Sequence, residues 1–147
     1  MRLRAGRRAP YGRSMNSAAI DRFCASLPHA TRVVQWRDVI VHKVGGKMFS
    51  MHPPRDGHRE LWFKADHAHY ESLKNAPGFR PCPYLARAGW VAVADPAALD
   101  PKEIKAYLTR AHGTIVARLP RKTQLAMGHA PTPKPAGKRR SAFDEPF

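Results

Sequence analysis

Lysine and arginine side chains that accompany strand-forming segments are the residues of this sequence best suited to a chemical role. Aromatic residues are interleaved with these cations at Trp62, Tyr84 and Trp90. Cations can contact phosphate oxygens, and aromatic rings can stack on bases. The pattern therefore predicts a basic nucleic-acid-binding surface, with core packing of the aromatics and simple solvation of each cation as the alternatives. The candidate cations of the folded region are Lys43, Lys47, Lys64, Arg80 and Arg87.

Motifs for nucleophilic catalysis or phosphate cradling are not found in the sequence. Neither Ser50 nor Ser72 has the flanking glycines of a nucleophile elbow. Gly45-Gly46-Lys47 lacks the upstream glycine and the following Ser or Thr of a phosphate loop, so a hairpin turn explains it better. We therefore expect no enzymatic activity and no cofactor.

Eight histidines and two cysteines could bind a metal, but their spacing does not favour it. Cys24 and Cys82 lie far apart, which excludes a zinc site of neighbouring cysteine pairs and does not suggest a disulfide scaffold. We expect no metal. A weaker alternative is a small-ligand or metal site that gathers His52, His58, His67 and Cys82.

Net charge is the strongest signal in the composition. The 147 residues include 26 Lys and Arg against 11 Asp and Glu, for a formal charge of +15. Residues 1–13 contribute +5, residues 14–120 contribute +6 and residues 121–147 contribute +4. Such a balance favours polyanionic partners, namely nucleic acid, an anionic membrane surface or an acidic protein. Solubility alone would be the simpler explanation.

Composition also divides the chain into one domain and two basic ends. Residues 1–14 are rich in Arg and poor in apolar residues, so we expect a disordered arm, and Met15 is an alternative start. Residues 15–120 form a single domain. Residues 121–147 are expected to be a disordered, basic, proline-rich tail. The tail cations expected to add nonspecific attraction are Lys138, Arg139 and Arg140.

The length and position of the apolar segments bear on the cellular location. No apolar run approaches the ~20 residues that a bilayer span requires. The arginine-rich N-terminal segment has no apolar stretch after its charges, unlike a secretory signal. We therefore expect a cytoplasmic protein that does not bind membranes, and we expect a monomer.

A β-hairpin centred on Gly45-Gly46 must position most of the candidate cations. Strand-forming residues flank this pair, which accepts the positive φ of a two-residue turn. The turn predicts that Val44 lies opposite Lys47. The further pairs in this register are His42 with Phe49 and Ile40 with Met51, which would put all six residues on one face.

Further strands and helices are expected around the hairpin. Residues 79–89 are expected to be an irregular connector. The order of elements predicts an α+β fold, with the helices on one face of an antiparallel sheet and the other face partly exposed. The expected helices begin at the caps Ser17, Asp66 and Asp100, and the further strands cover residues 31–36, 61–64 and 90–94.

Three blocks of sequence resemble a known family. They are residues 36–51, 61–66 and 83–93, and in this order they resemble the MmcQ/YjbR family across residues 17–119. The resemblance implies a CyaY-like (frataxin-like) fold and DNA binding, because the family's sheet looks like a double-wing DNA-binding motif. The matching positions are Val44, Gly45, Gly46, Lys47, Phe49, Lys64, Tyr84, Leu85 and Trp90.

The expected function is a small, non-enzymatic module that binds nucleic acid, DNA in particular, through phosphate contacts. A frataxin-like iron role would need an acidic first helix, and that helix offers only Asp21. The alternative function is a protein-interaction or regulatory module that docks a partner through the surface around Trp62 and Trp90.

Overall fold

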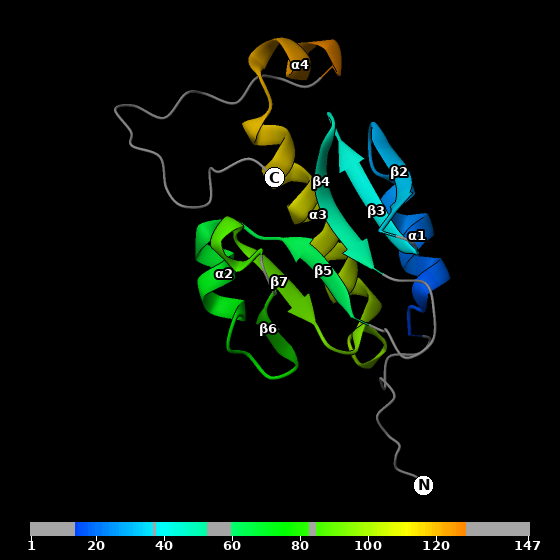
Figure 1. Ribbon diagram of the computed structural model, residues 1–147, viewed down its shortest axis with the longest axis vertical. Helices are drawn as coiled ribbons and strands as arrows, with labels where there is room; N and C mark the ends of the chain where they lie inside the picture. The colour runs from blue at the N-terminus through cyan, green and yellow to red at the C-terminus, as the bar shows by residue number, and fades with distance from the viewer. Residues whose placement is uncertain (1–13, 37, 53–59, 83–84, 129–147) are drawn as a thin grey trace, which may run out of the picture.

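The computed structural model describes residues 14–36, 38–52, 60–82 and 85–128 (Figure 1). The expected basic arm, apart from Ser14, and residues 129–147 of the expected tail lie outside these residues. Lys138, Arg139 and Arg140 are therefore among the residues that the structure does not describe, as are Tyr84 and His58.

One antiparallel sheet of six strands forms the centre of the molecule, as the sequence predicts. Its spatial order is β2-β3-β4-β5-β7-β6, and each neighbouring pair is antiparallel. The hairpin of β3 and β4 lies between the edge strand β2 and the second half of the sheet. The strands are β2 (Ala30–Gln35), β3 (Val39–Val44), β4 (Lys47–His52), β5 (Leu61–Lys64), β6 (Phe79–Pro81) and β7 (Trp90–Val93).

Strand β6 falls in the segment expected to be irregular, so that expectation is wrong for its first three residues. The strand pairs only with β7, at the edge of the sheet. Pro81 can end the strand there because an edge strand leaves one side without ladder hydrogen bonds. A three-residue strand flanked by prolines carries no recognisable alternation, which is why the sequence pattern does not show it.

The described residues also form four α-helices: α1 (Ser17–Ser26), α2 (His67–Leu73), α3 (Pro101–Arg118) and α4 (Arg121–Ala126). Two short 3₁₀ helices, η1 (Ala86–Ala88) and η2 (Pro96–Ala98), lie in the connections. None of the helices in the described ranges is long and apolar enough to cross a bilayer.

The helix caps match the sequence prediction at two of three positions. The side chains of Asp66 and Asp100 accept hydrogen bonds from the backbone N–H groups of the first turns of α2 and α3. At α1 the cap is Asn16 rather than Ser17, and its Oδ1 accepts from the N–H of Ala19 at 2.9 Å. Ser and Asn are similarly good caps, so the sequence alone does not decide which of two adjacent residues of these types begins the helix.

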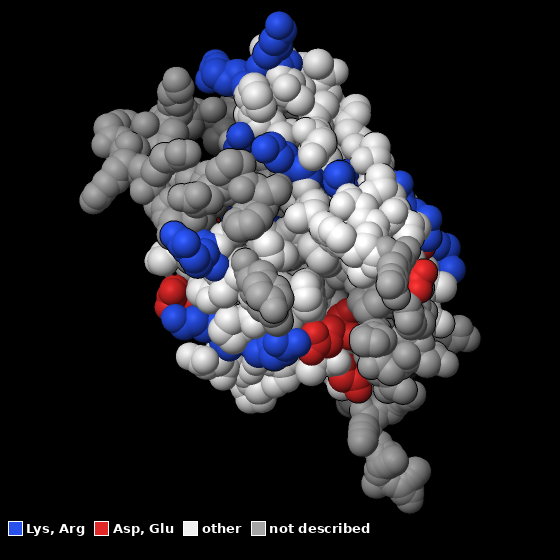
Figure 2. Space-filling view, in the orientation of Figure 1, with Lys and Arg blue, Asp and Glu red and all other residues white. Residues whose placement is uncertain are grey.

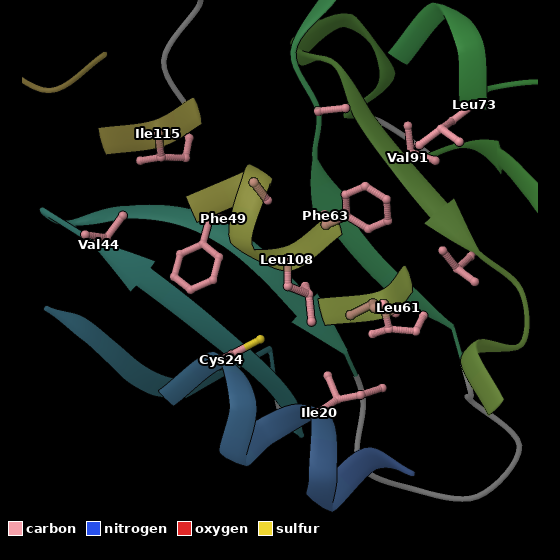
Figure 3. Packing of buried hydrophobic residues seen from close by; sticks show 14 of the residues in the cluster. Ile20, Cys24, Val44, Phe49, Leu61, Phe63, Leu73, Val91, Leu108 and Ile115 are labelled. Carbon is pink, nitrogen blue, oxygen red and sulfur yellow. The ribbon is translucent and has the colours of Figure 1, made fainter. Parts of the chain in front are cut away.

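The main core lies between one face of the sheet, here called the helix face, and helices α1, α2 and α3. Figure 3 shows Phe49 and Phe63 of the sheet pointing toward Leu108 of α3, with Cys24 of α1 on the same side. The long helix α3 lies against β4 and β5. Packing of all three helices on one face confirms the predicted layer arrangement.

The hairpin turn has the predicted geometry. Gly45 and Gly46 both have positive φ, at 60° and 82°, and Val44 pairs with Lys47. A β-carbon on Gly45 would lie 2.5 Å from Cδ1 of Leu119, at the end of α3. The turn therefore needs glycine twice over, for its backbone conformation and for close approach to the end of α3.

Beyond the turn, the predicted register is wrong. His42 pairs with Ser50 rather than with Phe49, because the register shifts beside it. Phe49 is thus the extra residue of a β-bulge. The bulge reverses the alternation for the rest of β4, so Met51 lies on the face opposite Phe49 and does not pair with Ile40.

The second face of the sheet carries its own apolar cluster, so it is not the exposed cationic face that the sequence predicts. The connector that contains η1 packs against this face. Among the aromatic candidates, Trp90 is buried here, and Trp62 is half-buried with its indole N–H donating to Glu60. The buried members of the cluster are Val41, Met51, Cys82, Ala88 and Trp90.

The folded unit extends past the predicted boundary at residue 120. Helix α4 follows Pro120 directly, and the side chain of Gln124 is buried and donates to the carbonyl of Leu119 at 2.8 Å. Nε2 of His29 lies 2.8 Å from the carbonyl oxygen of Met127. Residues 121–128 thus belong to the domain, although their composition resembles that of the tail.

Candidate nucleic-acid interface

Lys64 does not reach the surface. Its side chain extends along the second face of the sheet beneath η1, where it is only 3% exposed. Its ammonium group donates to the carbonyl of Ala88. A buried ammonium must be hydrogen-bonded, so Lys64 holds the connector to the sheet and is not available to a phosphate in this conformation.

Arg80 is exposed but neutralised. Its guanidinium lies on the edge strand β6 and donates to both carboxylate oxygens of Glu60, with Nη2 at 2.6 and 2.7 Å. This hydrogen bond with Glu60 raises the pKa of Arg80. A bidentate pair satisfies the geometry that a phosphate would otherwise use, so Arg80 offers little attraction to an anion.

Three predicted cations remain available to solvent. Arg87 is exposed on η1, on the second face. Lys43 is half-buried on β3, and Lys47 is exposed immediately after the hairpin turn. Lys43 and Lys47 flank the same turn but lie on different faces, because Lys43 pairs with Met48 of the second face and Lys47 pairs with Val44 of the helix face. Arg87 lies on η1, so the five predicted residues do not form one surface.

Several other cations have carboxylate partners at close range. Such pairs are local charge compensation and explain why these cations lie where they do. They are Arg32 with Asp21 at 3.0 Å, Lys74 with Glu71 at 2.9 Å, and Arg110 with Asp66 at 2.9 Å.

Four of the cations without such partners lie around the place where the β3–β4 turn meets the junction of α3 and α4. The contact of the turn with Leu119 places Lys47 next to this junction, and α4 then presents Arg121 and Lys122 to solvent. We call Lys43, Lys47, Arg121 and Lys122 the basic end. None of these four side chains forms an ion pair with a carboxylate in the parts of the chain that the structure describes.

The distribution of charge on the surface agrees with this grouping. Figure 2 shows Lys and Arg atoms over α4 and the neighbouring end of the sheet with no Asp or Glu atoms among them, whereas on the rest of this face Asp and Glu atoms lie near further Lys and Arg atoms. The 14 cations and 8 carboxylates in the described ranges leave a net charge of +6, to which the four cations of the basic end contribute. Such an end attracts polyanions.

Sequence reasoning missed Arg121 and Lys122, because it assigned them to the tail. A signal was present: Pro120 is followed by six residues that include good helix formers, and Leu125 and Met127 supply apolar side chains. Six residues are too few for a convincing periodicity, so proline content and charge outweighed that signal.

A second group of polar residues lies between α1 and the hairpin. We call Asp21, Arg32, His42 and His52 the polar cluster. Asp21 accepts from Arg32 and, at 2.9 Å, from Nε2 of the fully buried His42. Partial burial opposes ionisation of Asp21, but the hydrogen bonds and charges of Arg32 and His42 together outweigh it and lower the pKa of this carboxyl.

His52 is the unusual member of the polar cluster. Its ring is 3% exposed and stacks on His42 with centroids 6.1 Å apart, and neither ring nitrogen has a hydrogen-bond partner among the described residues. Burial, followed by the nearby charge on His42, lowers the pKa of His52 to about 4. The ring is therefore neutral at physiological pH. Burial of its two nitrogens without hydrogen-bond partners among the described residues reduces the stability of the fold.

The residues expected to gather into a ligand or metal site do not converge. His52 points to the helix face, Cys82 belongs to the cluster on the second face, and His67 is exposed on α2. In the described ranges no three His, Cys, Asp or Glu side chains are arranged to hold a metal ion. Burial raises the pKa of both thiols, Cys24 and Cys82, to about 12, so neither is a reactive thiolate.

Comparison with known proteins identifies relatives of this fold. The crystal structure of protein DR2400 from Deinococcus radiodurans, described as a DUF419 domain, superposes with a TM-score of 0.70 at 18% sequence identity. The match covers 86% of this chain and 97% of DR2400. No curated protein matches the sequence. The YjbR family model matches residues 25–114, which is more than half of the chain, so the protein belongs to the YjbR family.

Proposed function

We propose that this protein is a small, non-enzymatic module that binds nucleic acid, DNA in the first instance, through its basic end. The observation that carries the proposal is the grouping of Lys43, Lys47, Arg121 and Lys122 without carboxylate partners in the described ranges. Four such cations around one end of the domain could contact successive phosphates of a nucleic-acid backbone.

Fold stability does not account for these cations. Arg121 and Lys122 lie in the first turn of α4, where positive charge opposes the helix dipole. Lys47 lies at the turn, and like charges near it repel one another. The domain thus carries a small electrostatic cost at this end, which a polyanionic ligand would relieve.

Phosphate contacts supply most of the expected affinity. They are independent of base sequence and sensitive to salt, because each contact releases condensed counterions. Residues Lys138, Arg139 and Arg140 follow α4 in the sequence and would add further attraction. Lys64 and Arg80 are omitted from the interface, since one is buried and the other is paired with Glu60.

Fluorescence polarisation with a labelled duplex of about 20 base pairs tests the proposal. Four phosphate contacts predict that the logarithm of affinity falls by roughly 3.6 per tenfold increase in salt, so affinity drops about 150-fold between about 50 and 200 mM. The test variant is Lys47→Gln, Arg121→Gln and Lys122→Gln, which should weaken binding strongly and reduce the salt slope.

A matched control removes the same charge elsewhere. Arg22, Lys102 and Lys105 are exposed on α1 and α3, and their replacement by Gln lowers the net charge by the same three units. Binding close to that of the unmodified protein is expected for this control. Equal loss in both variants would show that only net charge matters and would remove the proposed interface.

A second candidate function rests on the edge strand β2. Val34 is 52% exposed and Trp36 is 60% exposed, and Trp36 has a positive φ of 44°, which is unusual for a bulky residue. An unprotected strand edge can pair with an extended segment of another protein. Partner capture that survives nuclease treatment and high salt, and that is lost in Trp36→Ser, would favour this candidate over nucleic-acid binding.

A further inference from the structure

Helix α4 exposes a large apolar side chain among the cations of the basic end. Leu125 is 61% exposed, and the only other large apolar side chains of the described ranges with comparable exposure are Val34 and Trp36. Those two lie on β2 and just after it, at the end of β3 that is remote from the Gly45-Gly46 turn. Leu125 is thus the exposed apolar residue of the basic end.

Helical spacing places Leu125 beside two cations. It follows Arg121 by four residues and Lys122 by three, so all three share one face of α4. The opposite face is held by the buried side chain of Gln124 and by Met127, which packs on the main core. The side chain therefore stands on an anchored helix and points to solvent.

The fold gains almost nothing from an exposed leucine, whereas a bound partner could remove it from water. The surrounding charge decides the class of partner, because Arg121 and Lys122 flank the side chain and an anionic surface must come within reach of both. Duplex nucleic acid offers phosphates for the cations and apolar sugar and base edges between them.

We propose that Leu125 packs against sugar and base edges of duplex nucleic acid and supplies a part of the affinity that does not depend on salt. This inference rests on the proposed function of the basic end. In this interface the cations determine how steeply affinity falls with salt concentration. The apolar side chain adds a contribution to affinity that is the same at every salt concentration.

The test compares Leu125→Ala with Val34→Ala in the full chain, by polarisation titration of the labelled duplex at several salt concentrations. Leu125→Ala should lower affinity about tenfold at every salt concentration, with an unchanged slope. Leu125→Met should retain most of the affinity. Val34→Ala, a comparably exposed residue outside the basic end, should bind as the unmodified protein does, and circular dichroism melting should show that all three variants fold.

Other outcomes separate the two levels of the proposal. Affinity unchanged by Leu125→Ala, with salt-dependent binding intact in the unmodified protein, would overturn the role of Leu125 alone. No salt-dependent binding by the unmodified protein would overturn the proposed function itself. Sedimentation with phosphatidylserine-containing vesicles covers the membrane alternative, and vesicle binding that Leu125→Ala abolishes while duplex binding persists would reassign this side chain to a lipid surface.

Discussion

The basic end and the polar cluster both contain several charged or titratable side chains, but they differ in whether these side chains have partners of opposite charge. In the polar cluster, Asp21 lies within hydrogen-bond distance of both Arg32 and His42. At the basic end, Lys47 and Arg121 have no carboxylate partner in the described ranges. The difference indicates that the first region serves the fold and the second is available to a ligand.

This contrast gives a rule that mutations can test. Changes at the basic end should alter affinity for nucleic acid and leave the free energy of unfolding nearly constant. Changes in the polar cluster should alter the free energy of unfolding and leave affinity nearly constant, because its side chains are buried or paired.

The largest effect is expected from charge reversal at the basic end. The triple variant Lys47→Glu, Arg121→Glu and Lys122→Glu should bind duplex DNA about a thousandfold more weakly, roughly tenfold for each lost contact. Its melting temperature should stay within a few degrees of the original, since these exposed cations contribute little to stability. A loss of affinity below about tenfold would contradict the assignment, and so would unfolding of the variant.

The next effect is the acid sensitivity that His52 gives to the fold. Its pKa is about 4 in the folded protein and about 6.5 when unfolded. The unfolded chain therefore binds the extra proton first, and stability falls as the pH decreases from about 6.5 to about 4. The loss over this window should be about 3 kcal/mol, measured by urea unfolding at a series of pH values.

A single variant isolates the contribution of His52. His52→Leu replaces the ring with an apolar side chain of similar size, so it should flatten the decline between pH 6.5 and 4. Nucleic-acid affinity at pH 7 should not change. An equally steep decline in His52→Leu would show that other groups cause the acid sensitivity.

A smaller change in stability is expected when the polar cluster loses its carboxylate. Asp21→Asn leaves Arg32 and the buried His42 without an ionised partner, which should cost about 2 kcal/mol at pH 7 because Asp21 is partly exposed. Chemical denaturation measures this directly. If the folded variant bound duplex DNA more than about threefold more weakly, the rule that the polar cluster does not affect affinity would be contradicted.

The smallest effect is expected at Arg87. It lies on η1 rather than at the basic end, so Arg87→Gln should change duplex affinity by less than about twofold in polarisation titrations. A loss comparable to that of Lys47→Gln would extend the interface along the second face of the sheet as far as η1, as the sequence alone predicts.

Local signals allowed much of the fold to be predicted from the sequence. Gly45-Gly46 defines the hairpin turn, and Asp66 and Asp100 mark helix starts through their side-chain hydrogen bonds. The bulge at Phe49 could not be predicted, because an extra residue in a strand has no distinctive sequence and depends on how α1 and α3 pack on the hairpin.

The site was harder to predict than the fold, because the availability of a cation depends on its neighbours in space. Lys64 and Lys47 are equivalent in type and lie near the same sheet, but only the structure shows that η1 covers Lys64. Likewise, Arg80 meets Glu60, which is 20 residues away in the sequence. Arg121 joins the basic end only because the end of α3 packs on the hairpin turn.

Mapping of the bound surface by nuclear magnetic resonance tests the central claim most directly. Amide resonances of the isotope-labelled full chain would be followed during titration with a short duplex at low salt. The account predicts that the shifted resonances belong to residues 43–48 and 119–126, while those of Asp21 and His52 stay in place. Shifts confined to other surfaces, or no shifts at all, would contradict it.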